Sequence, residues 1–164
     1  MKTQKRRKKE GKTDYLARLK LLKSETPRLV FRKTNKYIIS QYVESDSAKD
    51  KIIFGITSKA LLKHGWSKGL SGSLKSIPAS YLTGYLVAKR ILKDKLKEPI
   101  VDFGMQRIMG KTKIFAFLKG LLDGGIKVNC PEEKFPGEER IKGKDGKEGI
   151  QKAFSEVKSN LEKI

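Results

Sequence analysis

The sequence predicts an α/β fold in which helices cover one mixed β-sheet. Three short segments with strand-like alternation follow one another between residues 28 and 57. Two amphipathic helical patterns come next, at 77–96 and 112–122, separated by a short apolar segment at 99–103. The expected order is therefore β-β-β-α-β-α, a three-stranded antiparallel meander plus one parallel strand.

The strands are predicted from alternation and from turn residues. In the first strand, 28–32, Leu29 and Phe31 point to one side, and the two arginines point to the other. A tight turn at Thr34-Asn35 leads to a return strand at 37–43, so these two strands form a hairpin. The third strand, 51–57, is expected to share one face among Ile52, Phe54 and Ile56.

The long helix is predicted from its start and from its apolar spacing. Ser76 is a suitable N-cap and Pro78 lies in the first turn, while the glycine-rich segment 63–76 before it is expected to be a loop. One stripe is formed by Tyr81, Tyr85, Ala88, Leu92 and Leu96. A helical crossover after the third strand should place the strand at 99–103 parallel to a neighbour.

The two ends of the chain differ from its centre. Residues 1–24 are interpreted as a basic arm followed by a short helix at 15–23, for which Asp14 is the N-cap. Residues 25–130 are expected to form the globular α/β domain. Residues 131–164 are rich in Pro and Gly at their start and are expected to be an irregular extension, with a candidate terminal helix at 150–161.

Charge indicates the class of partner. The 164 residues include 38 Lys plus Arg and 18 Asp plus Glu, a net charge of +20. Residues 1–40 carry a net +11, whereas residues 129–164 are neutral. Such a basic chain repels itself unless a polyanion neutralises it, which favours nucleic acid or an anionic membrane surface as the partner. No membrane-spanning segment is expected, because no apolar run approaches the ~20 residues of a membrane span.

The sequence offers no convincing catalytic or metal-binding set. His64 is the only histidine, and no nucleophile motif accompanies it. Cys130 is the only cysteine, so a disulfide scaffold is excluded and a four-ligand zinc site lacks its ligands. Asp102-Phe103-Gly104 spells a kinase motif, but the other kinase motifs are missing. We therefore expect no enzyme activity, no cofactor, no metal and no small-molecule substrate.

Basic side chains in the arm and in the hairpin are the candidate binding groups. The arm contains an uninterrupted block of basic residues. This block should be disordered in the free protein and should bind the phosphates of a nucleic acid. It consists of Lys5, Arg6, Arg7, Lys8 and Lys9. The hairpin instead holds its groups at fixed spacing, and arginine forks suit phosphate while Asn35 can read a base edge. Its candidates are Arg28, Arg32, Lys33, Asn35 and Lys36.

Several motifs in order resemble one known family. They begin with Arg6-Arg7-Lys8-Lys9-Glu10-Gly11-Lys12-Thr13-Asp14-Tyr15, then Pro27-Arg28-Leu29-Val30 and Arg32-Lys33-Thr34-Asn35-Lys36-Tyr37. Pro78-Ala79-Ser80-Tyr81 and Glu138-Glu139-Arg140-Ile141 follow at suitable distances. Together they resemble the 5S rRNA-binding proteins of the large ribosomal subunit, in the archaeal branch of the archaeal and eukaryotic family.

The resemblance implies a structural protein of the cytoplasmic ribosome. Its partners would be 5S rRNA, large-subunit rRNA and neighbouring large-subunit proteins, with the domain on 5S rRNA and the arm in the larger RNA. Beyond the arm block and the hairpin, it adds as RNA-binding residues Lys12, Thr13, Tyr15, Arg18, Gln41, Trp66, Lys68 and Arg107. Trp66 can also be read as a half-buried anchor of the fold.

Two other classes remain open at this point. One is a free RNA-binding regulator or RNA chaperone that uses the same basic surface. The other is a membrane-surface protein, which would need an amphipathic helix with apolar residues free for lipid. The apolar stripe of the helix at 77–96 is needed to cover the sheet, which argues against that class.

Overall fold

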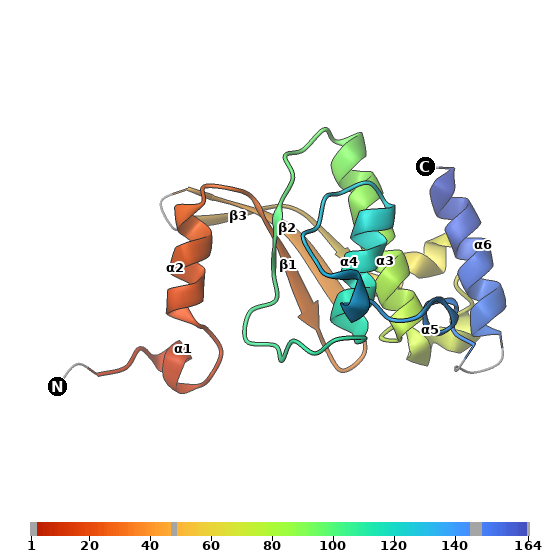
Figure 1. Ribbon diagram of the computed structural model, residues 1–164, viewed down its shortest axis with the longest axis horizontal. Helices are drawn as coiled ribbons and strands as arrows, with labels where there is room; N and C mark the ends of the chain where they lie inside the picture. Colours follow the sequence, from red (N-terminus) through yellow and green to blue (C-terminus); the bar gives the residue numbers. More distant parts are fainter. Residues whose placement is uncertain (1–2, 47–48, 145–148, 164) are drawn as a thin grey trace.

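The computed structural model describes residues 3–46, 49–144 and 149–163 (Figure 1). Residues 1–2, 47–48, 145–148 and 164 lie outside the described residues. In chain order the elements are α1 (Arg6–Lys9), α2 (Tyr15–Lys23), β1 (Arg28–Lys33), β2 (Ile38–Asp46), β3 (Lys49–Thr57), the 3-10 helices η1 (Ser58–His64) and η2 (Lys68–Ser73), α3 (Ile77–Lys93), β4 (Ile100–Asp102), α4 (Lys113–Asp123), the 3-10 turn η3 (Glu132–Lys134), α5 (Glu138–Lys142) and α6 (Ile150–Glu162).

The mixed sheet confirms the predicted fold class. Its four strands lie in the order β3-β2-β1-β4. β1 pairs antiparallel with β2, and β2 with β3, whereas β4 lies parallel to β1. The meander plus one parallel strand is therefore present as expected. The segment expected to be a loop at 63–76 is more regular, because η1 and η2 occupy much of it.

A β-bulge changes one expected face of β3. Tyr42 pairs with Phe54, but its neighbour Val43 pairs with Ile52, so Ile53 is the extra residue. The bulge places Ile52 on the side of the sheet opposite Phe54, and Ile52 is 54% exposed. The prediction that Ile52 shares the core face with Phe54 and Ile56 is wrong, since alternation breaks where a residue is inserted.

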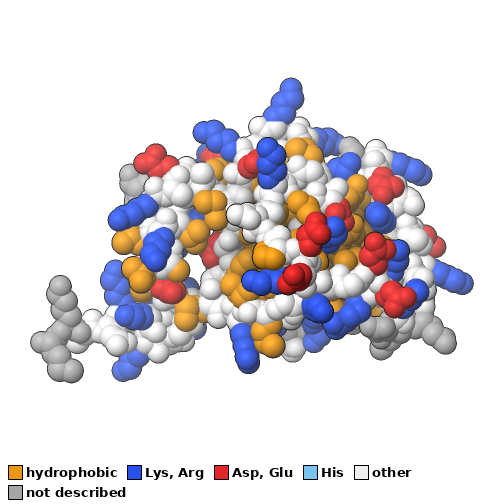
Figure 2. Space-filling model, in the orientation of Figure 1, with side chains coloured by type: hydrophobic (Ala, Val, Ile, Leu, Met, Phe, Trp, Pro, Cys, Tyr) orange, Lys and Arg blue, Asp and Glu red, His pale blue; other side chains and the backbone are white. Residues whose placement is uncertain are grey.

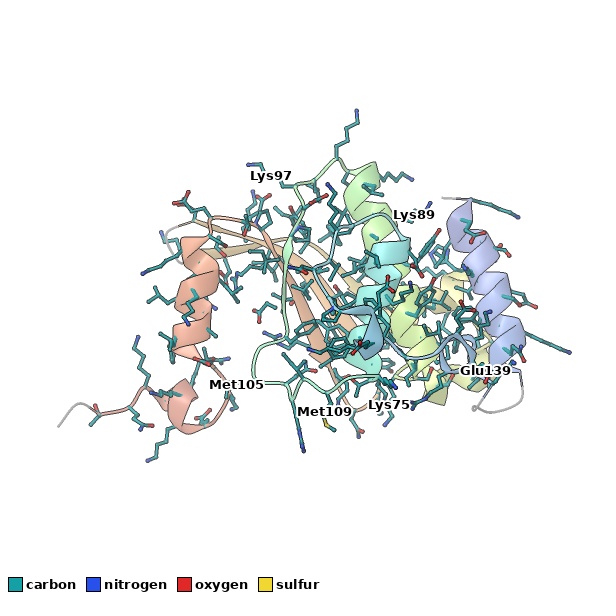
Figure 3. All side chains as sticks on the ribbon, in the orientation of Figure 1. Lys75, Lys89, Lys97, Met105, Met109 and Glu139 are labelled. Atoms are coloured by element: carbon teal, nitrogen blue, oxygen red, sulfur yellow. The ribbon has the colours of Figure 1, made fainter. Side chains whose placement is uncertain are left out.

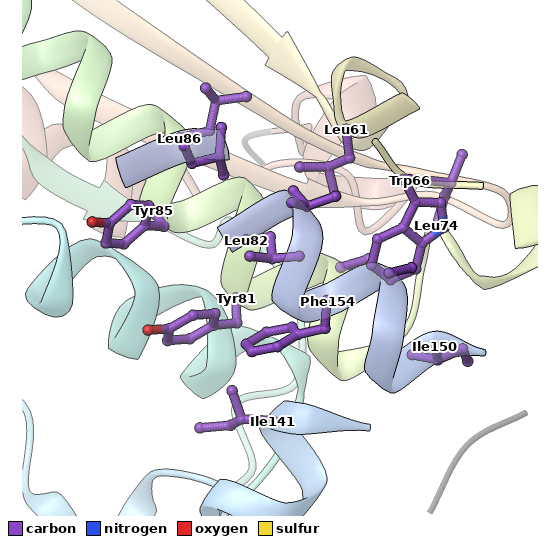
Figure 4. Close-up of a cluster of buried hydrophobic side chains, with 14 of the residues drawn as sticks. Leu61, Trp66, Leu74, Tyr81, Leu82, Tyr85, Leu86, Ile141, Ile150 and Phe154 are labelled. Carbon is purple, nitrogen blue, oxygen red and sulfur yellow. The ribbon is translucent and has the colours of Figure 1, made fainter. Parts of the chain in front are cut away.

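Helices α3 and α4 cover one face of the sheet. One core cluster joins Leu29, Phe31 and Tyr42 of the strands to Ile91 of α3 and Phe117 of α4, among others. A second cluster lies on the other side of α3 (Figure 4). Because α3 is buried between the two clusters, it is more than the one-sided amphipathic helix that the sequence predicts. Leu92, expected within its apolar stripe, is 51% exposed.

The C-terminal segment belongs to this second cluster. Phe154, Val157 and Leu161 of α6 are buried there, and Phe154 lies 5.7 Å from Tyr81 between ring centroids. The Asn160 side chain also donates a hydrogen bond of 2.8 Å to the His64 carbonyl. The expected terminal helix is therefore present, but residues 131–164 are less irregular than expected, since α5 and α6 pack against the domain.

α3 and α4 approach each other closely at glycines. The Ser80 hydroxyl donates a hydrogen bond of 2.6 Å to the Lys113 carbonyl, and Gly84 lies against Phe117 one turn further along. The contacts advance together along both helices, which therefore run parallel. A Cβ added at Gly84 or Gly120 would collide with backbone carbonyl oxygen of the facing helix. Only glycine permits this spacing.

Candidate nucleic-acid interface

The arm and α2 project from one end of the molecule (Figure 1). Asp14 caps α2 as predicted, since its carboxylate accepts hydrogen bonds from the amides of Leu16 and Ala17. No residue of α1 or α2 is buried, and Leu16 and Leu19 are 64% and 50% exposed. The arm differs from the expected irregular chain in its single helical turn, α1. An ion pair of 2.9 Å joins Arg18 of α2 to Asp50 of β3.

A hollow between α1 and α2 collects several predicted RNA-binding residues. It is lined by Lys5, Arg7, Thr13, Tyr15, Arg18, Leu19 and Leu22. Lys5 Nζ lies 4.5 Å from the centre of the Tyr15 ring, and Arg7 Nε donates a 2.9 Å hydrogen bond to Thr13 Oγ1. Cations, a hydroxyl and an aromatic face therefore meet at one exposed place, a combination that suits a nucleic-acid backbone and a base.

The position of Arg28 differs from the prediction that this residue binds RNA. It lies on the predicted side of β1, but its side chain is only 3% exposed. Its Nη2 lies 2.7 Å from Asp50 Oδ1, and its Nη1 lies 3.4 Å from Asp102 Oδ2. A guanidinium buried between two carboxylates has no free fork for phosphate. We therefore assign Arg28 a structural role in place of the predicted RNA contact.

Arg28 is the centre of a chain of alternating charges. Arg18 of α2 lies 2.9 Å from Asp50, and Arg32 of β1 lies 3.6 Å from Asp102. The order Arg18–Asp50–Arg28–Asp102–Arg32 links α2 to the centre of the sheet. Asp50 and Asp102 are thus each matched by arginines, which offsets the repulsion of an approaching polyanion by these two carboxylates.

Asp50 is held in its charged form by this arrangement. Burial alone would raise the pKa of Asp50, but hydrogen bonds from Ser45 and Arg28 and the positive charge of Arg28 outweigh it, so the pKa lies below its ordinary value. A carboxyl whose pKa is lowered by folding contributes stability at neutral pH, and that stability is lost as the pH falls through the lowered pKa.

The rest of this sheet face is only partly covered. Val30, Arg32, Ile39 and Gln41 are half-buried, and Gly55 beside Gln41 is exposed. Arg32 donates hydrogen bonds from Nη1 to the carbonyls of Phe31 and Asp102, at 2.8 and 3.1 Å. Its guanidinium is therefore fixed in direction while its side chain remains 42% exposed. Arg107, in the loop after β4, is exposed as expected.

The hairpin turn displays most of its predicted binding residues. Thr34 and Tyr37 close the turn, with Thr34 Oγ1 accepting from the Tyr37 amide at 2.9 Å. Lys33, Asn35 and Lys36 are exposed around this rigid turn. The Tyr37 ring, by contrast, is faced by Lys59 Nζ at 4.3 Å from its centre.

Lys68 and Trp66, both predicted to bind RNA, differ in their exposure. Lys68 is exposed at the start of η2, as a binding residue must be. Trp66 is 1% exposed and lies within the second core cluster (Figure 4). Its indole cannot stack on a base, so the predicted RNA contact is wrong and the anchor interpretation holds.

The structure adds cations that the sequence did not single out. Lys59 and Lys75 line a hollow with Asn35, Lys36 and Tyr37, and Lys75 Nζ donates a 3.4 Å hydrogen bond to Asn35 Oδ1. Both lysines are far from the hairpin in sequence. No local pattern could have found them, because their proximity is created by the packing of η1 and α3 against β2.

The described residues also bear on metal, membrane and thiol chemistry. Within the described ranges, no three His, Cys, Asp or Glu side chains gather as metal ligands. No described helix has the length and apolarity needed to cross a membrane. Burial raises the pKa of the Cys130 thiol, which is the reverse of what a reactive cysteine needs.

An α/β sheet covered on one face by helices, with many Lys and Arg side chains on the surface drawn in Figure 2 and a net charge of +20, defines a basic protein suited to a polyanion such as nucleic acid. Residues 1–100 match the family described as ribosomal large subunit proteins 60S L5 and 50S L18. The chain is 46% identical over 138 residues to large ribosomal subunit protein uL18 of Korarchaeum cryptofilum, covering 84% of this chain and 69% of the relative.

It is also 40% identical over 159 residues to large ribosomal subunit protein uL18 of Methanoculleus marisnigri, covering 97% and 89% of the two chains. Identity to uL18 of Methanothermobacter thermautotrophicus is 41% over 138 residues, or 84% and 70%. The chain therefore belongs to the uL18 family of large-subunit ribosomal proteins, in its archaeal branch. It is a ribosomal protein of the cytoplasm, from a structural rather than an enzymatic family.

Proposed function

We propose that this protein binds 5S rRNA and helps to attach it to the large-subunit rRNA. The observation that carries the proposal is the charge arrangement around the open sheet face. The carboxylates of Asp50 and Asp102 are paired with arginines, whereas Lys33, Lys36 and the arm remain exposed. An RNA approaching this face therefore meets a largely uncompensated positive surface.

The two exposed basic regions would act differently. The arm has no buried side chain to fix it, so it supplies phosphate attraction that is insensitive to sequence. The hairpin turn is closed by the Thr34–Tyr37 hydrogen bonds, so its groups keep a defined spacing. A defined spacing is what recognition of one folded RNA surface requires. The arm is then left to reach a second RNA.

Competition between RNAs tests the proposal directly. 5S rRNA and an unrelated structured RNA of equal length are competed for the full chain at about 0.15 M salt. We expect 5S rRNA to win clearly, because only it matches the spacing of the turn. Equal competition would overturn the proposal and favour a free RNA regulator or chaperone, for which stable association with a ribosomal particle is not expected.

Replacing Asn35 by alanine should lower the affinity for 5S rRNA without lowering the affinity for unrelated RNA. Asn35 is exposed and uncharged, so its loss releases no counterions. One lost base-edge contact is expected to cost about 1–3 kcal/mol, measured by equilibrium binding. Asn129→Ala, at another exposed asparagine, is the matched control and should leave both affinities unchanged. If both RNAs lose affinity together, or neither does, the turn is not the recognition element.

Replacing Asp50 by asparagine should weaken RNA binding although it removes a negative charge. Arg18 and Arg28 each lose their carboxylate partner, so α2 is no longer held beside β3. We expect about a fivefold loss, the scale of one partly exposed charged contact worth about 1 kcal/mol. Glu44→Gln removes one charge from an exposed site on β2, the strand paired with β3, and should leave binding equal or tighter.

Tighter binding by Asp50→Asn would show that the carboxylate only repels RNA, which would contradict a positioning role.

The same variant should also change how the free energy of unfolding depends on pH. Because the pKa of Asp50 is lowered in the folded state, wild type should lose its stability advantage over Asp50→Asn as the pH falls below about 4. Urea unfolding at several pH values measures this difference.

A further inference from the structure

A second basic feature lies where the start of α4 meets the end of β1. It is a groove of about 390 Å³ lined by Lys33, Ile77, Arg107, Met109, Lys111, Thr112, Lys113, Ile114 and Arg140. We call it the α4 groove. Its residues come from β1, α3, the loop after β4, α4 and α5, so tertiary packing alone assembles it. Met109 and the neighbouring Lys75 appear close to this margin of the molecule in Figure 3.

The α4 groove concentrates positive charge. Lys33, Arg107, Lys111, Lys113 and Arg140 all line it, and among the residues that the structure describes no carboxylate does. Lys113 is only half-exposed. Its burial, and then the charges of Lys33 and Lys75, lower the pKa of its ammonium. Cations gathered along one groove indicate a surface suited to an anion.

The lining of the groove suits a nucleic-acid backbone. Apolar side chains of Ile77, Met109 and Ile114 line it together with the cations. It also lies beside the hairpin turn, because Lys33, which lines it, is the last residue of β1 and leads directly into Thr34 and Asn35. A strand of RNA crossing the turn could therefore extend its phosphates along the groove.

We propose that the α4 groove binds backbone phosphates of RNA, through Lys33, Lys111 and Lys113. The inference rests on the proposed function, and it adds to that function a second phosphate track beyond the arm and the turn. The track makes one continuous path from Asn35, past Lys75, to Lys113. RNA seated there would relieve the repulsion between Lys113 and its two neighbouring lysines.

Lysine acetylation of the full chain, with and without RNA, locates the bound surface. Lys33 and Lys111 are exposed and should react severalfold more slowly when 5S rRNA is bound. Lys93, Lys127 and Lys152 are exposed at other places and should keep their reactivity. Mass spectrometry of the modified peptides gives each rate. Protection of the arm without protection of Lys33 and Lys111 would overturn the groove and leave the proposed function intact.

Substitution supplies a second, independent readout. Changing Lys33, Lys111 and Lys113 together to glutamine should flatten the log–log salt dependence of RNA binding by about two units, for three contacts of about 0.7 each. The control variant changes Lys93, Lys127 and Lys152 to glutamine and carries the same net charge. Equal slopes for the two variants would overturn the proposal.

The outcomes for the groove and for the proposed function are distinguishable. If an unrelated RNA protects Lys33 and Lys111 as well as 5S rRNA does, and competes equally, the groove stands and the 5S-specific function fails. If neither RNA protects these lysines, the groove fails. Urea unfolding checks that both triple variants still fold. The acetylation experiment uses the wild-type chain, so its result does not depend on the stability of the variants.

Discussion

Gly84→Ala and Gly120→Ala are each expected to lower the free energy of unfolding by about 3 kcal/mol, the upper end of the usual cost of overpacking. In an ordinary helix the same change would stabilise the protein, because alanine exceeds glycine in helix propensity by about 1 kcal/mol. Here a Cβ at Gly84 would collide with the Phe117 carbonyl, and one at Gly120 with the Tyr81 carbonyl. The expected sign is therefore opposite to that of helix propensity.

Urea unfolding of the RNA-free protein measures both changes. Gly72→Ala is the control, because a Cβ there meets nothing within 4 Å, and its effect should stay within about 0.5 kcal/mol. Since both glycines lie at one helix crossing, the double variant should cost less than the sum of the single variants. A stabilised Gly84→Ala or Gly120→Ala would show that α3 and α4 are not in backbone contact.

Removing residues 1–13 is expected to have the largest effect on RNA binding. The deleted segment contains seven Lys or Arg and no buried residue among those described, so it contributes charge rather than packing. With each phosphate contact worth about 0.7–0.9 in the log–log salt slope, we expect the slope to flatten by about 3–6 units. Affinity for a long RNA near physiological salt should fall on the order of 100-fold or more.

Binding measured at several salt concentrations tests the deletion. A variant with residues 2–12 in scrambled order keeps the same charges and should retain the wild-type slope. Urea unfolding of the truncated chain should match wild type, since α1 buries nothing. An unchanged slope after truncation would exclude phosphate binding by the arm.

The sequence by itself determined the features that depend on near neighbours along the chain. Alternation located β1 and β2, and Asp14 predicted the start of α2 correctly, because a cap bonds to amides two and three residues away. The parallel position of β4 followed from the helical crossover before it. Charge, which needs no geometry, identified the basic arm and the class of partner.

Only the tertiary structure decided which basic and aromatic groups stay available. Arg28 alternates like a surface residue, but Asp50 and Asp102, 22 and 74 residues away, bury and pair it. Trp66 stands in a polar segment, yet residues of α6 close over it. Lys75 and Lys113 likewise come close to the hairpin residues Asn35 and Lys33 only through tertiary packing. Periodicity records the repeat of one helix or strand, whereas such contacts exist only after separate elements pack, so sequence spacing carries no trace of them.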